Sequence, residues 1–139
     1  MAELSTDIAA PPSTVWEIWT DVERWPEWTA STTKVERLAS GPLAVGSKVR
    51  IKQPRLPRVT WEVIDVDEPR RFSWRSRSPG YTAVGDHEIT KLGEGVRVIL
   101  RITTSGMLAG IMNRLTDGIT RRYLQLEAEG LKRRAERVS

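Results

Sequence analysis

His87 is the side chain best suited to transfer a proton near neutral pH. It is the single imidazole of the chain, and alternation places it on the inward side of a predicted strand together with the phenol of Tyr81. An imidazole can act as a general acid or base on an enolisable molecule. Asp86 and Glu88 flank it but should point outward, so neither forms a dyad with it. Two interpretations remain open: catalytic residues His87 and Tyr81, or a structural histidine hydrogen-bonded inside the sheet.

A second group of residues has the make-up of a small-molecule site, an apolar lining with a few polar atoms. Gly118 lies in the middle of the last helical segment and would remove bulk on its inward side, which favours a cavity. Small inward residues on one strand, Ala83 and Gly85, favour it too. The alternative is a filled core. The predicted lining is Ile51, Gln53, Trp61, Trp74 and Ser76 from strands, Met107, Met112, Leu115, Ile119 and Tyr123 from the last segment, and Trp25 and Trp28 as a cap at one end.

Several classes of site are excluded by composition. The 139 residues include no cysteine and one histidine. This rules out a disulfide scaffold, a thiolate zinc site, an iron–sulfur cluster, a cysteine nucleophile and a multi-histidine metal site. Gly93 and Gly95 fall in a predicted hairpin, so they do not form a phosphate-binding loop. We therefore expect no metal and no cofactor.

The elements that must position these residues follow from hydropathy periods of two and 3.6. A strand is predicted over residues 2–9. Two short helices should follow, with the capping-box spacings Thr14–Glu17 and Thr20–Glu23 at their starts. Six strands are then predicted over residues 33–39, 48–53, 59–66, 71–77, 81–91 and 96–104, and a long helix over about 108–136. Consecutive strands with short turns indicate an antiparallel sheet with the long helix covering one face, an α+β architecture.

The charge distribution suggests a basic surface. The net charge is +4, with −5 on residues 1–32 and +9 on residues 33–139. Arg71, Arg75 and Arg77 share the outer face of one predicted strand. Such a face could attract nucleic acid, an anionic membrane or a protein partner, but a solvated sheet face is the more common explanation, and nucleic-acid binding is not expected.

The sequence shows neither a membrane-spanning segment nor a secretory signal peptide. No stretch approaches the ~20 apolar residues that span a bilayer, and no secretory signal precedes the first strand. We therefore expect a cytoplasmic protein without a membrane span. A homodimer through an exposed sheet edge is possible.

Several short motifs make the chain resemble START-like (SRPBCC) domains of the polyketide cyclase/dehydrase type. The resemblance covers nearly the whole chain and implies a helix-grip fold, in which a seven-stranded antiparallel sheet wraps around a long C-terminal helix. The motifs are Ile-Ala-Ala-Pro-Pro-Ser-Thr-Val-Trp at residues 8–16, Asp21, Trp-Pro-Glu-Trp at 25–28, Gly-Pro-Leu at 41–43 with Val-Gly at 45–46, Glu-Pro-Arg-Arg-Phe at 68–72, Gly-Val-Arg-Val at 95–98, Gly106, and Glu-Gly-Leu-Lys at 129–132.

The resemblance also implies functions. It predicts a single domain over residues 1–139 with an internal cavity for a small hydrophobic or aromatic molecule, lipid-like or polyketide-like. One hypothesis is binding without chemistry. The alternative is a cyclase, aromatase or dehydratase, in which His87, Tyr81 or another inward polar group transfers protons to a confined ligand. A third hypothesis, from the charges, is an interaction module that uses the arginine-rich outer face.

Overall fold

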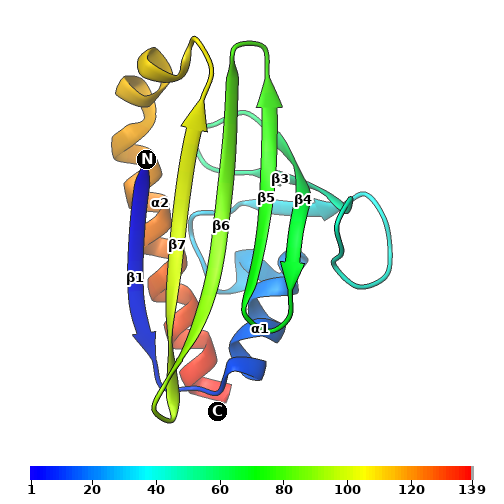
Figure 1. Cartoon of the computed structure of the whole chain (residues 1–139), viewed down its shortest axis with the longest axis vertical. Coiled ribbons are helices and arrows are strands. Elements are labelled where there is room, and N and C mark those ends of the chain that lie inside the picture. The colour runs from blue at the N-terminus through cyan, green and yellow to red at the C-terminus, as the bar shows by residue number, and fades with distance from the viewer. Residues whose placement is uncertain (139) are drawn as a thin grey trace.

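One curved antiparallel sheet and one long helix dominate the computed structural model, which describes residues 1–138 (Figure 1). The sheet order is β1-β7-β6-β5-β4-β3-β2. This is the helix-grip arrangement that the sequence predicts, and it is confirmed. In chain order the elements are β1 (Ala2–Ile8), α1 (Pro12–Thr20), the 3-10 helix η1 (Val22–Glu27), β2 (Lys34–Arg37), β3 (Lys48–Lys52), β4 (Val59–Asp67), β5 (Arg71–Ser78), β6 (Tyr81–Leu92), β7 (Gly95–Ser105) and α2 (Ala109–Val138).

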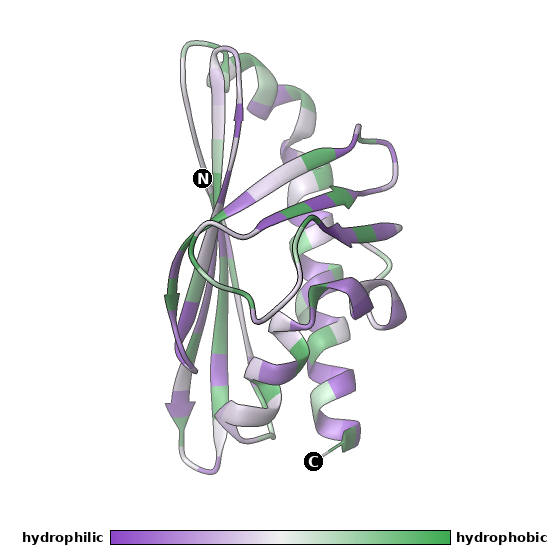
Figure 2. Ribbon diagram, turned by 90° about the vertical axis from the view of Figure 1, so that its right-hand side faces the viewer, coloured by the Kyte–Doolittle hydropathy of each residue, from purple (hydrophilic) through white to green (hydrophobic). Residues whose placement is uncertain are grey.

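The sheet bends around α2, while α1 and η1 fill the space beside the C-terminal half of that helix (Figure 2). A register shift in the β4–β5 pairing between Val63 and Asp65 contributes to this curvature, because a bulge increases local twist. The fully buried side chains include Trp19 of α1, Phe72 of β5 and Leu131 of α2. The core therefore lies where α1, the sheet and the second half of α2 meet.

Gly130 sets how closely α2 approaches η1. A Cβ atom built at Gly130 would collide with the backbone oxygen of Trp28. Only a glycine allows this close contact between the helix and the residue that ends η1. The contact fixes the depth of α2 inside the sheet and so the room left beside its first half.

The two predicted capping boxes are wrong. Helix α1 starts after Pro11 without a side-chain cap, since Pro12 at its start needs no hydrogen-bond partner. The second helix begins after Asp21 instead of Thr20, whose hydroxyl donates to the carbonyl of Trp16 at 2.7 Å. That short helix is 3-10 rather than α and carries Pro26 within it. In residues 1–138, no helix combines the length and the apolar character that a bilayer crossing requires.

Candidate functional site

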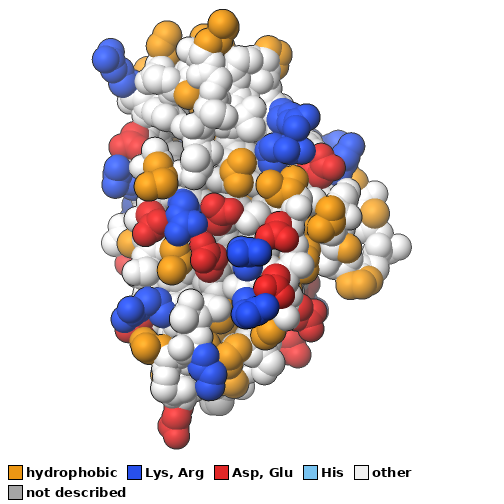
Figure 3. Space-filling view, viewed as in Figure 1, with side chains coloured by type: hydrophobic (Ala, Val, Ile, Leu, Met, Phe, Trp, Pro, Cys, Tyr) orange, Lys and Arg blue, Asp and Glu red, His pale blue; other side chains and the backbone are white. Residues whose placement is uncertain are grey.

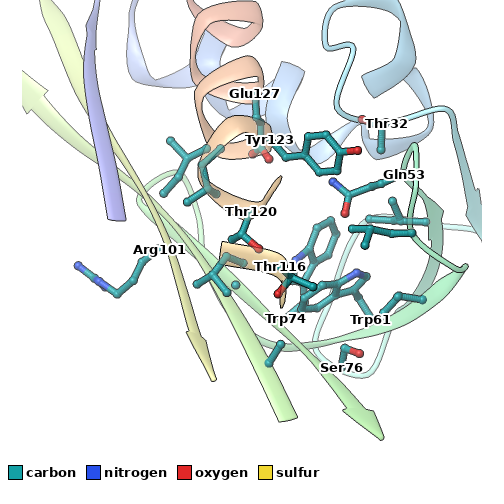
Figure 4. A pocket seen from close by; sticks show the side chains of 18 of the residues that line it. Thr32, Gln53, Trp61, Trp74, Ser76, Arg101, Thr116, Thr120, Tyr123 and Glu127 are labelled. Carbon is teal, nitrogen blue, oxygen red and sulfur yellow. The ribbon is translucent and has the colours of Figure 1, made fainter. Parts of the chain in front are cut away.

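A cavity of about 270 Å³ lies between the concave face of the sheet and the first two thirds of α2 (Figure 4). Its volume is near the lower end of small-molecule pockets, which range over roughly 300–1,000 Å³. Exposed Pro57 and Ser78 belong to its wall, so it opens to solvent between the β3–β4 loop and the β5–β6 turn. Its wall is mostly apolar and aromatic. The aromatic and polar side chains of the lining, with one methionine, include Trp25, Thr32, Gln53, Trp61, Trp74, Ser76, Tyr81, His87, Met112, Thr116, Thr120, Tyr123 and Glu127.

Tryptophan rings form one wall of the cavity. The ring of Trp74 lies 5.8 Å from that of Trp61 at 32° and 5.4 Å from that of Trp25 at 50°. A Cβ atom at Gly85 would stand 3.0 Å from Nε1 of Trp74, so the missing side chain makes room for this indole. Its small size suggested that Gly85 enlarges the cavity. In the structure, Gly85 instead makes room for the aromatic wall. Such a wall suits a flat, apolar molecule.

Hydroxyl and amide groups stand at separate places around this wall (Figure 4). On α2, Thr116 donates to the carbonyl of Met112 at 2.8 Å, which leaves its oxygen lone pairs free to accept. Across the cavity, the buried hydroxyl of Thr32 has no hydrogen-bond partner anywhere in residues 1–138. A buried hydroxyl without a partner costs free energy, and a bound polar atom would offset that cost.

One hydrogen bond connects α2 with the loop that borders the opening. The Tyr123 hydroxyl donates to the carbonyl oxygen of Pro54. Lys52 also holds this loop, because its ammonium donates to the carbonyls of Gln53 and Leu56. The rim near Gln53 is thus tied to the helix.

At the deep end of the cavity, Glu127 and His87 form a buried acid–imidazole pair. Nε2 of His87 lies 3.8 Å from Oε2 of Glu127, too far for a direct hydrogen bond. The indole of Trp19 donates to the same carboxyl oxygen at 2.9 Å. The His87 ring stacks on Phe72 at 4.1 Å, and its Nδ1 lies 3.2 Å from the carbonyl oxygen of that residue. Because a carbonyl only accepts, the proton of the neutral ring sits on Nδ1 and the lone pair of Nε2 faces Glu127.

Burial disfavours the charged form of both groups of this pair. Desolvation raises the pKa of Glu127 from 4.5 to about 7, although the Trp19 hydrogen bond opposes the shift. Desolvation lowers the pKa of His87 from 6.5 to about 4, and the Phe72 carbonyl and the Asp86 charge oppose that shift more weakly. At neutral pH His87 is an uncharged acceptor, and Glu127 is partly protonated. The pair can therefore give a proton from the carboxyl group or take one at Nε2.

Ten of the sequence-predicted residues do line the cavity. His87 lies at its deep end, whereas Tyr81 lies half-buried near its opening. Burial raises the pKa of the Tyr81 phenol above its usual 10, so at neutral pH that group can only donate a hydrogen bond or accept one. The other eight are Trp25, Ile51, Gln53, Trp61, Trp74, Ser76, Met112 and Tyr123.

Four of the predicted lining residues do not reach the cavity. Trp28 packs on Trp25, with ring centroids 5.5 Å apart, on the side of η1 that faces α2. Met107 and Leu115 are exposed to solvent, and Ile119 is half-buried outside the lining. In this part of α2, the helix face that meets the sheet carries Thr116 and Thr120 instead of the predicted Leu115 and Ile119. Gly118 accordingly points to open space and contributes nothing to the cavity.

The sequence reasoning missed three polar residues on α2: Thr116, Thr120 and Glu127. Together with Tyr123 they follow steps of four, three and four residues, which place them on one helical face. That spacing was visible in the sequence. Apolar side chains recur at similar steps on the same helix, so spacing alone does not single out this face.

The outer face of the sheet has the composition of a solvated surface, with acidic and basic side chains interleaved (Figure 3). Arg101 bridges Glu3 at 2.7 Å and Glu88 at 2.8 Å, and Arg71 bridges Asp65 at 2.9 Å. These pairs neutralise much of the basic character expected there. Across residues 1–138, no three His, Cys, Asp or Glu side chains come together in a group that could hold a metal ion.

Solved structures of other proteins share this fold. The aromatase/cyclase Zhui from Streptomyces sp. R1128 is 22% identical, with a TM-score of 0.79 over 98% of this chain and 93% of its own. TTHA0849 from Thermus thermophilus is 21% identical, with a TM-score of 0.78 over 99% and 98%. A START superfamily protein from Mycobacterium smegmatis is 19% identical, with a TM-score of 0.72 over 99% and 98%. At these identities the likeness concerns the fold alone.

Sequence comparison supplies the family. No curated protein matches the chain. The family model described as polyketide cyclase/dehydrase and lipid transport matches residues 2–136, which is nearly the whole chain. The chain therefore belongs to the polyketide cyclase/dehydrase and lipid transport family.

Proposed function

We propose that this protein binds a compact, largely flat apolar molecule that carries one or more oxygen functions, of the polyketide-like or lipid-like kind. The observation that carries the proposal is the cavity of about 270 Å³ beneath the Trp61–Trp74 wall. At roughly 30 Å³ of liquid volume per water molecule, this space equals about nine waters. A bicyclic molecule matches that size, whereas a long acyl chain would have to extend through the opening.

The polar groups suggest how such a molecule would be oriented. Its ring system would lie against the indoles, while an oxygen at one end would form hydrogen bonds with the side chains of Thr32 and Gln53. A second oxygen would reach Thr120 or Glu127 on α2. In small-molecule sites generally, a small number of polar groups in an otherwise apolar cavity fixes the orientation of the ligand.

The binding proposal can be tested with 2-naphthol, a bicyclic phenol, as the probe. Its binding should quench the fluorescence of the cavity tryptophans, and native mass spectrometry should detect a one-to-one complex. Thr116→Trp places an indole in the cavity and should abolish the quenching. Arg133→Trp, on an exposed site of the same helix, is the matched control. Undiminished binding to Thr116→Trp, in a variant with unchanged thermal unfolding, would place the ligand elsewhere.

A second candidate function is dehydration or cyclisation of the bound molecule, and the Glu127–His87 pair favours it. In a β-hydroxy ketone, Nε2 of His87 would accept the proton from the carbon next to the carbonyl. Glu127 would give its proton to the hydroxyl group. The carbon–oxygen bond then breaks, water leaves, and the electron pair of the broken C–H bond becomes the new C=C bond. The fold shared with the aromatase/cyclase Zhui is consistent with this chemistry.

Two substitutions separate catalysis from binding. Glu127→Gln keeps an acceptor for the indole of Trp19 but carries no acidic proton. It should leave 2-naphthol binding within a few-fold and abolish the release of water from a bicyclic β-hydroxy ketone such as 4-hydroxy-2-decalone, followed by absorbance of the enone. Thr120→Val, at another polar lining position, is the control for the loss of one hydrogen bond. Absence of turnover by the wild type would leave binding as the function of the site.

A further inference from the structure

The first turns of α2 and the two residues before it carry exposed apolar side chains. Met107 is 89% exposed, Leu108 42%, Ile111 63% and Leu115 73%. The opposite side of the same turns presents Met112, Thr116 and Thr120 to the cavity. A helix on a globular protein normally shows the reverse pattern. We refer to Met107, Leu108, Ile111 and Leu115 as the apolar tip.

The apolar tip forms one end of the molecule together with the β5–β6 turn. The amide of Leu108 donates to the carbonyl of Gly80 at 2.9 Å, so the turn and the start of α2 are held together. Figure 1 shows both at the upper end of the fold, and hydrophobic side chains gather along that end in Figure 3. An exposed apolar patch at one end of a protein marks a site of interaction.

Charge on the two segments that form this end of the molecule is of one sign, although Glu62 of β4 lies opposite Arg75 in the β4–β5 pairing. Residues 75–85 and 103–116 contain the arginines Arg75, Arg77 and Arg114 and no acidic residue. No ion pair of these three arginines is found among the described residues. Elsewhere on the sheet, arginines such as Arg71 and Arg101 are paired with carboxylates. The tip thus combines apolar side chains with unneutralised positive charge.

This combination fits an anionic lipid surface better than a protein partner. A second copy of the chain would bring the same arginines together, and like charges oppose that contact. A stable protein interface needs about 20–30 residues on each side, whereas the tip offers a turn and two helical turns. Insertion of a few side chains between lipid headgroups needs no such area and is strengthened by flanking arginines.

We infer that the apolar tip docks on the surface of a bilayer that carries anionic headgroups. Met107, Ile111 and Leu115 enter the headgroup region, and Arg77 and Arg114 lie against the lipid charges. The opening of the cavity adjoins the tip through Ser78 and Tyr81 of the β5–β6 turn. Docking therefore places the opening beside the membrane, where apolar molecules concentrate. Docking does not require the cavity to be filled, so it stands apart from the proposed function.

Co-sedimentation with vesicles tests the docking. The protein should sediment with phosphatidylcholine vesicles that contain phosphatidylglycerol, and much less with pure phosphatidylcholine. Burying one Leu or Ile contributes about 1.5–3 kcal/mol, so Ile111→Asn and Leu115→Asn should each weaken partitioning about tenfold or more. Arg77→Gln combined with Arg114→Gln should remove the preference for phosphatidylglycerol. Leu92→Asn at the β6–β7 turn and Arg133→Gln, both at exposed sites, are matched controls that should behave as wild type.

Each contrary result has a definite meaning. Failure to sediment with either vesicle overturns the inference, as does sedimentation unaffected by Ile111→Asn and Leu115→Asn. A dimer in light scattering that Ile111→Asn dissociates would assign the tip to a second copy. Complete displacement from vesicles by soluble polyglutamate would point to an acidic protein instead. The tip residues are exposed, so thermal unfolding of these variants should match wild type and exclude misfolding as the cause.

Discussion

Replacing Glu127 with glutamine should make the protein more stable, and the gain should grow with pH. The carboxyl group has a pKa of about 7 in the folded protein and 4.5 as a model group. The unfolded chain therefore loses its proton first as the pH rises above about 4.5, while the folded protein holds it until about pH 7. Stability falls across that window, because the folded state binds more protons than the unfolded state.

The size of the effect follows from the two pKa values. One pKa unit corresponds to about 1.36 kcal/mol, so the interval from 4.5 to about 7 amounts to about 3 kcal/mol. In the wild type, Nε1 of Trp19 donates to Oε2 of Glu127 at 2.9 Å. Glutamine cannot ionise, but its amide oxygen can still accept this hydrogen bond. Apart from a constant offset, Glu127→Gln should match wild type near pH 4 and exceed it by about 3 kcal/mol at pH 8.

Wild-type stability alone would hide this effect. His87 has its pKa lowered from 6.5 to about 4, so the folded state binds fewer protons there than the unfolded state. The contribution of His87 to the free energy of unfolding falls as the pH drops through the window from 6.5 to about 4. It therefore opposes the contribution of Glu127. The two changes nearly cancel between pH 4 and 7. The informative quantity is therefore the difference between variant and wild type at each pH.

Urea unfolding followed by tryptophan fluorescence at several pH values between 4 and 8 measures that difference. Glu129→Gln, on the exposed side of α2, is the matched control and should show no comparable dependence on pH. A constant difference between Glu127→Gln and wild type would contradict the reasoning. If Glu127→Gln instead became less stable than wild type toward pH 8, Glu127 would be ionised in the folded protein. It would then be attracted to a protonated His87 across their 3.8 Å separation.

Three further substitutions test the packing and the rim. Gly130→Ala should destabilise the protein by about 1–3 kcal/mol in urea unfolding, because its Cβ would meet the Trp28 backbone oxygen; unchanged stability would mean that α2 can shift outward. Leu131→Ala should cost about 2–5 kcal/mol in the same assay, since the side chain is fully buried; a cost below this range would indicate collapse of the core around the gap. Tyr123→Phe removes the hydrogen bond to Pro54, so amide hydrogen exchange in residues 55–56 should accelerate, and equal exchange rates would show that the loop is held without it.

Strand residues were predicted more reliably than helix residues, for a physical reason. In a strand, a period of two leaves only two faces, and the polar face of β5 and β6 is unmistakable. His87 and Trp74 were therefore placed correctly on the concave side. In a helix, periodicity shows which residues share a face but not which face meets the sheet. Leu115 was thus assigned inward although threonines occupy that side.

Glu127 shows what a local pattern cannot supply. Its carboxyl group is buried because Trp19 and His87, both distant in sequence, close around it. In isolation a glutamate on a helix is expected in solvent. Only the assembled fold reveals the buried acid, so this part of the candidate site could not be predicted from one segment.

The pairing of β1 with β7 has a consequence for how the chain reaches its fold. Ala2 pairs with Ile102, and Ile8 pairs with Val96, so β1 can pair only with the last strand of the sheet to be made. During synthesis β1 leaves the ribosome without a partner, and its edge stays unpaired until β7 emerges. Contacts between such distant segments slow folding, since a large loop must close before they form. The sheet is thus complete only once β7 has been made, and α2, which follows β7 in the chain and packs against β1 and α1, can dock only afterwards.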